Sequence, residues 1–272
     1  MSDDWFAWHI APDGDIEDGC HPQEAQALKE YLRQDTTPTD AAQAITRPIA
    51  TATNPREHLY RLWGLPIDAL LELPQDHTDA LLALLQANQD LLNPASLLNV
   101  AHEGGWKHLP GFGNLWSDRY LTYTWRANLP SPSDLNRATF RDEHIRRANV
   151  VACLFKADIA GIPFDWGYEV IADALESSNA VLDFEVPAAA EWFIVCGTRF
   201  LEGARRGERN WALTGSYNGL SRDMWRVSQD GVMDLGRWEF WKERLRKVQK
   251  EGVAVGSVGR ALVAMEQAEM TV

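Results

Sequence analysis

The chain has 272 residues, 45% of them hydrophobic and 24% charged, which are the proportions of a folded globular protein rather than a disordered one. Its formal net charge of -13 repels phosphate backbones and anionic lipid headgroups, so neither nucleic acid nor a membrane surface is an expected partner. Three cysteines make no disulfide framework, and neither a signal peptide nor a membrane-spanning apolar run occurs, so we expect a cytoplasmic protein.

Helical patterns dominate the first third of the chain. The spacing of apolar residues predicts helices over 22–34, 39–52, 55–63 and 76–92. Proline removes a backbone donor inside a helix, so Pro48 is expected to kink or end the second of these helices. The third is expected to stop before Gly64 and Pro66. Residues 93–113 are rich in glycine and proline and are predicted to form a long loop.

The helical pattern continues through the rest of the chain. Helices are predicted over 114–127, about 132–160, 164–177, 187–204, 234–249 and about 254–270. Residues 205–233 hold several glycines and charged clusters, which predict a partly ordered loop. No convincing run of alternating β-branched residues occurs, so the predicted fold class is all-α.

The helix predicted over 187–204 differs from the others because it is apolar on nearly every side. Trp192 to Cys196 form an unbroken run of apolar residues. Such a helix must be surrounded by other helices, so it is predicted to be the centre of a single multi-helix bundle. We expect one all-α domain over 1–272, in which residues 1–92 can form an N-terminal helical subdomain joined by the loop 93–113.

Three stretches of the chain form a pattern of their own. They are Leu109-Pro-Gly-Phe-Gly-Asn-Leu-Trp-Ser-Asp-Arg-Tyr120, Val186-Pro-Ala-Ala-Ala-Glu-Trp192 and Gly236-Arg-Trp-Glu-Phe-Trp-Lys-Glu-Arg244. In their order and spacing they resemble a family of fungal proteins known as a domain of unknown function, over roughly residues 100–270. The resemblance implies no established activity, catalytic residue or cofactor. It does imply a place in fungal specialised metabolism.

Glu191 is the first candidate catalytic residue. It lies on the predicted central helix beside Trp192, and a buried, partly protonated carboxyl group in aromatic surroundings suits general acid catalysis. The alternative is a structural ion pair with an arginine from another helix. A helix that starts at Pro187 would also place Glu191 near its positive end, so exposure or stabilisation by the helix dipole stays open.

Asp118 is the second candidate. It stands with Trp116 and Arg119 in the first of the three stretches, within the first turn or so of the helix predicted from 114. There its carboxylate can accept backbone hydrogen bonds and stabilise the helix dipole. The functional alternative is an acid or base that faces a pocket.

Tryptophan is the most unusual part of the composition, with 12 residues. Each brings a large apolar surface and one N–H group that needs a partner when buried, so most are expected in the core. An interior this aromatic can also line a pocket for a flat, apolar ligand. The candidate substrate-binding residues are Trp116, Trp166, Trp192 and Trp241. Asp165, directly before Trp166, is expected to cap a helix.

The sequence predicts neither a cofactor nor a metal site. The stretch from Gly111 to Trp116 begins like a dinucleotide-binding fingerprint, but a preceding strand and the third glycine are missing. The histidines lack the spacing of metal ligands, and His102 and His108 are the best pair of a weak set. Asp76 and Asp79 are explained by the start of a helix.

The helix predicted over 234–249 has two different faces. Its apolar face carries Leu235, Trp238, Trp241, Leu245 and Val248. Its other face is charged and carries the basic residues Arg237, Lys242, Arg244, Arg246, Lys247 and Lys250. We expect this second face to be solvated, with a docking surface for an acidic partner as the alternative.

Two functions fit these observations. The first is a cofactor-independent enzyme or binder acting on an apolar small molecule, with isomerisation, cyclisation or dehydration by a positioned acid as the reaction class. The alternative is a protein–protein interaction module that uses the acidic surface or the helix over 234–249. A closed apolar pocket with a convergent carboxylate favours the first function, and a large exposed apolar patch favours the second. The sequence indicates no oligomeric state.

Overall fold

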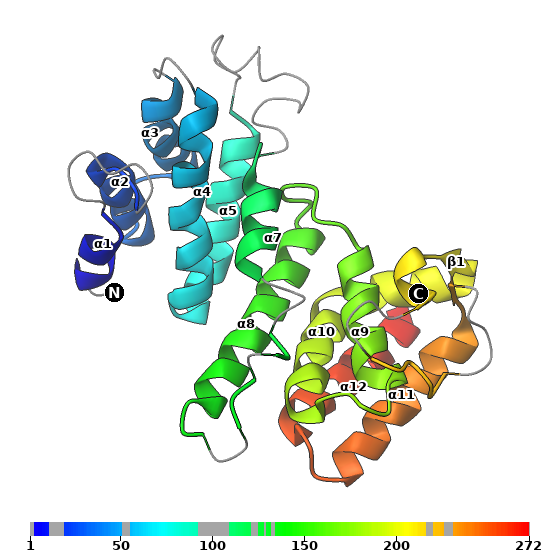
Figure 1. Ribbon diagram of the computed structural model, residues 1–272. Helices are drawn as coiled ribbons and strands as arrows, with labels where there is room; N and C mark the ends of the chain where they lie inside the picture. Colours follow the sequence, from blue (N-terminus) through cyan, green and yellow to red (C-terminus); the bar gives the residue numbers. More distant parts are fainter. Residues whose placement is uncertain are drawn as a thin grey trace. The chain divides into compact units, whose positions relative to one another are not determined.

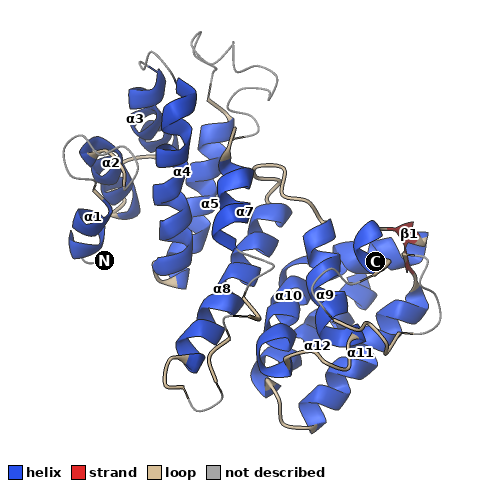
Figure 2. Ribbon diagram, viewed as in Figure 1, coloured by secondary structure: helices blue, strands red, loops and turns tan. Residues whose placement is uncertain are grey.

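In the computed structural model of the protein, the regular structure of the described residues is almost entirely helical (Figure 2). It describes residues 3–10, 19–50, 55–91, 109–120, 125–127, 129–131, 134–215, 220–225 and 231–271, with the backbone alone at 50, 55–57, 119 and 120. The predicted all-α class is confirmed. None of the helices in these ranges is long and apolar enough to cross a membrane.

The chain divides into two compact units. Unit 1 combines Met1–Thr122 with Ala157–Ile162, and unit 2 combines Tyr123–Lys156 with Pro163–Val272. The predicted organisation, one domain with an N-terminal subdomain, stays a prediction. Most of the loop predicted over 93–113, together with His102 and His108, lies outside the described residues.

Unit 1 is built from short and medium-length helices (Figure 1). They are α1 (Asp3–His9), α2 (Pro22–Leu32), α3 (Pro38–Ala50), α4 (Pro55–Glu72), the 3-10 turn η1 (Gln75–His77), α5 (Thr78–Gln89) and α7 (Phe112–Tyr120). Helix α2 packs on α1 and α3, α3 packs on α4 and α5, and α4 also packs on α5 and α7. The core of this unit therefore lies around α3 and α4.

Helix α4 is longer than the sequence predicts. Instead of stopping before Gly64 and Pro66, it continues to Glu72. Pro48 likewise does not end its helix, since it lies inside α3. A proline inside a helix costs about 3 kcal/mol. That cost is outweighed in α4 because the turns on both sides of Pro66 bury apolar side chains, among them Trp63 and Ile67.

Unit 2 contains the longest helix of the described chain. Its elements are α8 (Arg137–Lys156), α9 (Asp165–Glu176), α10 (Leu182–Arg206), β1 (Glu208–Arg209), the 3-10 turn η4 (Trp211–Leu213), β2 (Val232–Met233), α11 (Leu235–Lys250) and α12 (Val255–Thr271). Helix α10 packs against α8, α9, α11 and α12 (Figure 1). The predicted central helix is thus confirmed, although it begins at Leu182 and contains Pro187 instead of starting there.

An aromatic cluster fills the space around α10. Phe200 packs against Phe164, Trp192 and Trp241, with ring centroids 4.5, 6.3 and 6.4 Å apart. Gly167 makes this packing fit, because a Cβ atom there would lie 2.8 Å from the rings of both Phe200 and Trp192.

The segment predicted as a partly ordered loop over 205–233 holds a small amount of regular structure. β1 and β2 pair antiparallel, with Glu208 opposite Met233. Left-handed Gly207 ends α10 just before β1. Gly231 has a positive φ just before β2, where a Cβ atom would lie 2.8 Å from the Asn210 carbonyl oxygen. These contacts are long-range in sequence, which is why local patterning does not reveal them.

Candidate functional site

Three of the four predicted site residues of unit 2, Glu191, Trp192 and Trp241, are buried in its core. Trp192 and Trp241 are fully buried and belong to the aromatic cluster around Phe200. The Trp241 Nε1–H donates to Glu176 Oε1 at 2.7 Å, so its polar atom is satisfied within the protein. Trp166 is partly buried, in the first turn of α9. The ligand-binding role predicted for these tryptophans stays a prediction.

Glu191 forms the structural ion pair that the sequence left open. Its Oε1 accepts from Arg260 Nη2 at 3.0 Å, and its Oε2 accepts from Asn149 Nδ2 at 2.9 Å. Both carboxylate oxygens are therefore occupied. Since α10 begins at Leu182, Glu191 is well inside the helix and not near its positive end.

Glu191→Gln is expected to lower the free energy of unfolding by about 1–3 kcal/mol, because the charge-assisted bond to Arg260 is lost while Asn149 keeps an oxygen to donate to. Denaturant unfolding measures the change. Glu266→Gln is the matched control, since Glu266 faces Arg246 at 3.7 Å in a solvent-exposed pair, and should change stability by less than about 1 kcal/mol. A Glu191→Gln variant of wild-type stability that had lost ligand binding or turnover would support the catalytic role instead.

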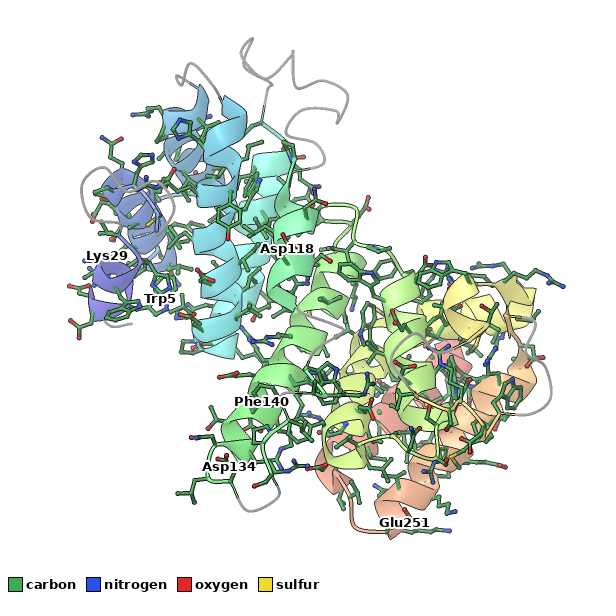
Figure 3. The ribbon with its side chains drawn as sticks, in the orientation of Figure 1. Trp5, Lys29, Asp118, Asp134, Phe140 and Glu251 are labelled. Carbon is green, nitrogen blue, oxygen red and sulfur yellow. The ribbon has the colours of Figure 1, made fainter. Side chains whose placement is uncertain are left out.

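Asp118 and Trp116 belong to unit 1, whereas the other four predicted site residues belong to unit 2. Because α7 begins at Phe112, Asp118 is exposed in the second half of the helix, and the predicted first-turn position is wrong (Figure 3). Trp116 is buried and stacks on Phe112 with ring centroids 6.2 Å apart. The six predicted site residues are therefore divided between the two units, and their role as one site stays a prediction.

Asp165 has a different role from the one predicted. The residue before α9 is Phe164, so Asp165 begins the helix instead of capping it. Its carboxylate accepts from Asn210 Nδ2 at 2.6 Å and from Trp211 Nε1 at 2.5 Å. The side chain thus ties α9 to the η4 segment.

The charged face predicted for α11 is only partly solvated. Arg237 is buried and donates Nε and Nη2 to the Glu176 carboxylate at 2.7 and 2.9 Å. Lys242 is also buried, with Nζ 2.5 Å from Glu269 Oε1. On the predicted apolar face, Leu235 is 50% exposed, whereas Trp238 is buried.

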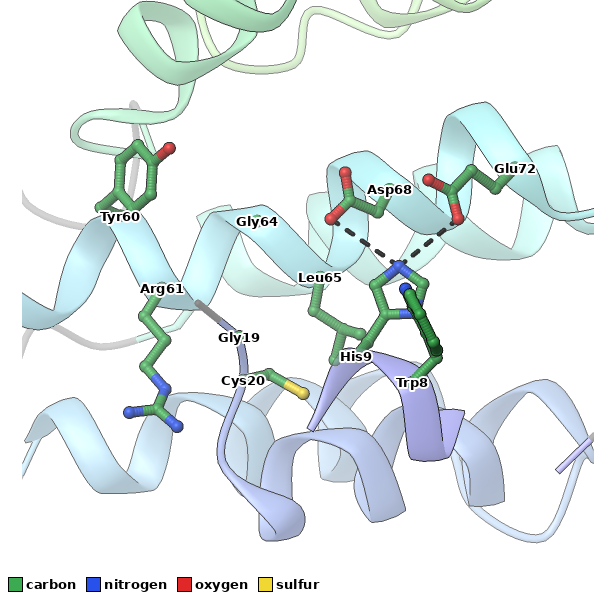
Figure 4. Close-up of a pocket in the computed structure, with 10 residues that line it drawn as sticks. All are labelled: Trp8, His9, Gly19, Cys20, Tyr60, Arg61, Gly64, Leu65, Asp68 and Glu72. Carbon is green, nitrogen blue, oxygen red and sulfur yellow. Dashed lines mark ion pairs between the residues drawn. The ribbon is translucent and has the colours of Figure 1, made fainter. Parts of the chain in front are cut away.

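A pocket of about 410 Å³ opens in unit 1 (Figure 4). It is lined by Trp8 and His9 of α1, by Gly19 and Cys20 before α2, and by Tyr60, Arg61, Gly64, Leu65, Asp68 and Glu72 of α4. Its volume lies in the range of small-molecule sites. The pocket combines titratable groups with the exposed aromatic side chains of Trp8 and Tyr60, which are 86% and 55% exposed.

One face of α4 supplies most of this lining. Arg61, Leu65, Asp68 and Glu72 are three or four residues apart, the spacing that places side chains on the same side of a helix. Figure 4 shows Tyr60 and Arg61 at one end of the row and Asp68 and Glu72 at the other, with His9 facing the two carboxylates. The pocket exists because α4 continues through Pro66.

His9 is the group best placed for proton transfer. Its Nε2 lies 3.4 Å from Glu72 Oε2 and 3.9 Å from Asp68 Oδ2. Its Nδ1 lies 2.7 Å from the Trp5 carbonyl oxygen. A carbonyl oxygen only accepts, so Nδ1 carries the hydrogen of this bond, and Nε2 is the atom that can take up or release a proton.

Hydrogen bonds link α1 to α4 and to Cys20. The Trp5 Nε1–H donates to Glu72 Oε2 of α4 at 2.9 Å. The Cys20 backbone N–H donates to the His9 carbonyl at 2.8 Å, which ties Cys20 to the end of α1. These contacts set the position of the His9 ring in the pocket wall.

Cys20 is buried in the pocket wall and is a poor nucleophile. Burial raises the pKa of its thiol to about 12, and the charge of the nearby Glu24 acts in the same direction. Nucleophilic attack and metal ligation need the thiolate, so we assign Cys20 a packing role. In the described part of the chain, no group of three histidine, cysteine or acidic side chains could hold a metal ion.

Glu24 interacts electrostatically with Arg61 of the pocket and is almost fully buried. Burial raises its pKa to about 7, although the hydrogen bond from the His21 backbone N–H and the charge of Arg61 act in the opposite direction. In the folded protein this carboxyl group therefore changes its charge near neutral pH.

The raised pKa of Glu24 predicts a pH-dependent contribution to stability. The folded protein holds this proton more tightly than the unfolded chain, so the contribution is complete below pH 4.5 and is lost as the pH rises towards about 7. The full effect is on the order of 3 kcal/mol, at roughly 1.4 kcal/mol per pKa unit. We expect Glu24→Gln to become more stable relative to wild type over this interval, as measured by denaturant unfolding at pH 4.5, 6 and 8. A stability difference that stays constant over the three pH values would contradict the assignment.

The pocket residues were not found from the sequence. His9 and Cys20 lack any motif, and an α4 that ends at residue 63 separates Arg61 from Asp68 and Glu72. The available signal was the recurrence of Arg61, Leu65, Asp68 and Glu72 at helical spacing across Pro66.

Fold and pocket together define an all-α protein with a polar, titratable pocket on its N-terminal helices. The family model described as "Protein of unknown function (DUF3632)" matches residues 63–245, more than half of the chain, and the protein belongs to this family. The three stretches that carry the family resemblance lie inside the matched range, whereas Trp8, His9 and Arg61 precede it. No curated protein and no solved structure matches the chain.

Proposed function

We propose that the protein binds a small molecule in the pocket of unit 1 and that His9 exchanges a proton with this ligand. The observation that carries the proposal is that a pocket of about 410 Å³ is lined by an imidazole that lies next to two carboxylates. Exposed aromatic side chains at the rim, Trp8 and Tyr60, offer apolar surface to a ligand at little cost in side-chain ordering.

The side chains of the pocket support cofactor-independent acid–base chemistry. His9 Nε2 can accept a proton from a bound ligand, and Asp68 and Glu72 stabilise the imidazolium that results. Isomerisation, cyclisation and dehydration are reactions that need only such transfers. Together with the resemblance to fungal proteins, they favour an enzyme or binder of specialised metabolism that acts in the cytoplasm.

The ligand that fits this pocket is less apolar than the one predicted from the sequence. Leu65, Trp8 and Tyr60 suit an apolar body, but Arg61, His9 and the two carboxylates need polar groups opposite them. We therefore propose an amphiphilic small molecule.

The test is a panel of small amphiphilic compounds, scored by the rise in melting temperature that a ligand of the folded state produces. Compounds that bind in the pocket should stabilise wild type and the Trp211→Ala control, which removes a half-exposed tryptophan of unit 2. They should fail to stabilise a Trp8→Ala/Tyr60→Ala double variant. Hits that stabilise all three proteins equally would place the binding elsewhere and overturn the proposal.

A substrate found in this way tests the role of His9. His9→Gln should retain binding and reduce turnover by about 10²–10⁴-fold, the usual contribution of general acid–base catalysis. Retained turnover would leave the pocket as a binding site without this chemistry.

A protein–protein interaction module is the second candidate. The observation in its favour is the exposure of Val263 and Met270, which lie seven residues apart on α12 and therefore on one face. Loss of self-association or partner binding in a Val263→Ser/Met270→Ser variant, with pocket binding unchanged, would support this candidate.

A further inference from the structure

Arg61 carries a buried charge that the surrounding protein leaves partly unsatisfied. The residue is 8% exposed and lines the pocket. Its Nε has no hydrogen-bond partner among the described residues, and the guanidinium forms no ion pair with any carboxylate in those ranges. An unpaired buried charge is strongly unfavourable, so a group that accepts hydrogen bonds from it is needed.

The neighbours of Arg61 limit what that group can be. Glu24 is close enough to influence Arg61 electrostatically but makes no ion pair with it. His21 and His58 lie nearby, and burial, then Arg61, then His58 lower the pKa of His21, so this imidazole is neutral at neutral pH. Asp68 and Glu72 make the other end of the pocket acidic. A ligand with several negative charges is therefore disfavoured.

We propose that Arg61 is the anchor for the carboxylate of a monoanionic small-molecule carboxylic acid. The proposal rests on the small-molecule function proposed above and names the class of ligand. The planar guanidinium offers parallel N–H donors whose geometry matches a carboxylate. This pairing gives the guanidinium an acceptor from the pocket and leaves the apolar body of the acid against Leu65 and Tyr60.

The length of the row on α4 sets the length of the ligand. Arg61 and Asp68 are seven residues apart, a rise of roughly 10 Å along a helix at 1.5 Å per residue. A carboxylate at Arg61 therefore places the opposite end of an extended molecule beside His9, Asp68 and Glu72 (Figure 4). The acid group is held at one end of the pocket and proton transfer takes place at the other.

Three probes with the same body and different charge test this assignment. They are 4-phenylbutyrate, 4-phenylbutanol and 4-phenylbutylamine, titrated into the full-length protein by ligand-observed NMR, which measures the weak binding expected of such small molecules. We expect 4-phenylbutyrate to bind at least tenfold more tightly than the alcohol, and the amine to bind most weakly. Arg61→Gln should remove the preference for the acid, and the exposed control Arg47→Gln should keep it.

The outcomes separate this assignment from the proposed function. Equal or tighter binding of the alcohol or the amine, sensitive to Trp8→Ala/Tyr60→Ala, would overturn the role of Arg61 and leave the pocket intact as a small-molecule site. If the Trp8→Ala/Tyr60→Ala change does not affect binding, or if no probe binds, both the role of Arg61 and the proposed function are overturned. If Arg61→Gln does not fold, the ranking of the three probes on wild type still decides the assignment.

Discussion

Replacing Arg237 by alanine is expected to lower the free energy of unfolding by about 3–5 kcal/mol, the cost of breaking a buried ion pair from one side. The guanidinium is fully buried and makes two hydrogen bonds to the Glu176 carboxylate, at 2.7 and 2.9 Å. It also donates to the backbone carbonyls of Val232 and Leu213, at 2.8 and 3.2 Å. Arg237→Ala would leave the buried carboxylate and both carbonyls short of a donor. Denaturant unfolding of wild type and variant gives the difference.

The matched control lies on the same helix. Arg246 pairs with Glu266 at 3.7 Å and both side chains are about half exposed, so Arg246→Ala should cost less than about 1 kcal/mol. Equal losses for Arg237→Ala and Arg246→Ala would show that the Glu176 pair contributes nothing beyond a surface contact. In that case the structural role assigned to Arg237 would be wrong.

Trp241→Ala is expected to cost about 3–5 kcal/mol, the range for the loss of a large buried aromatic side chain. Trp241 is fully buried, packs against Phe193 and Phe200 with ring centroids 6.0 and 6.4 Å apart, and donates to Glu176. Truncation would leave a cavity at the meeting point of α10 and α11 and remove one of the donors to Glu176. The shift of the denaturant midpoint at unchanged slope measures the loss.

Leu235→Ala tests whether the start of the apolar face of α11 is exposed. Leu235 is 50% exposed, so its truncation should change the free energy of unfolding by less than about 1 kcal/mol. A cost as large as that of Trp241→Ala would show that Leu235 is buried in the folded protein.

Sequence patterning predicts most of the described helices because they carry apolar stripes, but it did not predict α1, which spans Asp3–His9. The central position of α10 follows from a run of apolar residues that no exposed helix would tolerate. Patterning fails where burial in the folded protein outweighs a local preference, such as the tendency of proline to end a helix. Pro66 and Pro48 end helices in isolation, but burial of their neighbours keeps α4 and α3 continuous.

The candidate site was harder to predict for a physical reason. Residues such as Glu191, Trp192 and Trp241 stand out in a sequence because a buried carboxylate or tryptophan is unusual, and the structure gives each of them packing or hydrogen-bond partners in the core. Whether Glu191 or Asp118 has a catalytic role stays a prediction.

The pocket of unit 1 lacks this kind of signal. His9, Arg61 and Glu72 are common residue types in ordinary surroundings, and they form a site only when the hydrogen bond from Trp5 to Glu72 links α1 to α4. That arrangement depends on long-range contacts, which residue spacing does not encode. The unpaired Nε of Arg61 is likewise visible only in three dimensions.

Native mass spectrometry of the protein purified from its own cells tests the central claim most directly, that the pocket of unit 1 holds a small-molecule ligand. We predict that wild type and Arg47→Gln retain a bound organic acid, which collisional activation releases as an anion, and that the Trp8→Ala/Tyr60→Ala and Arg61→Gln variants lack it. A wild-type protein that carries no small molecule when purified under the gentlest conditions and binds none of the amphiphilic compounds would contradict the claim. The same holds if a bound molecule persists unchanged in both pocket variants.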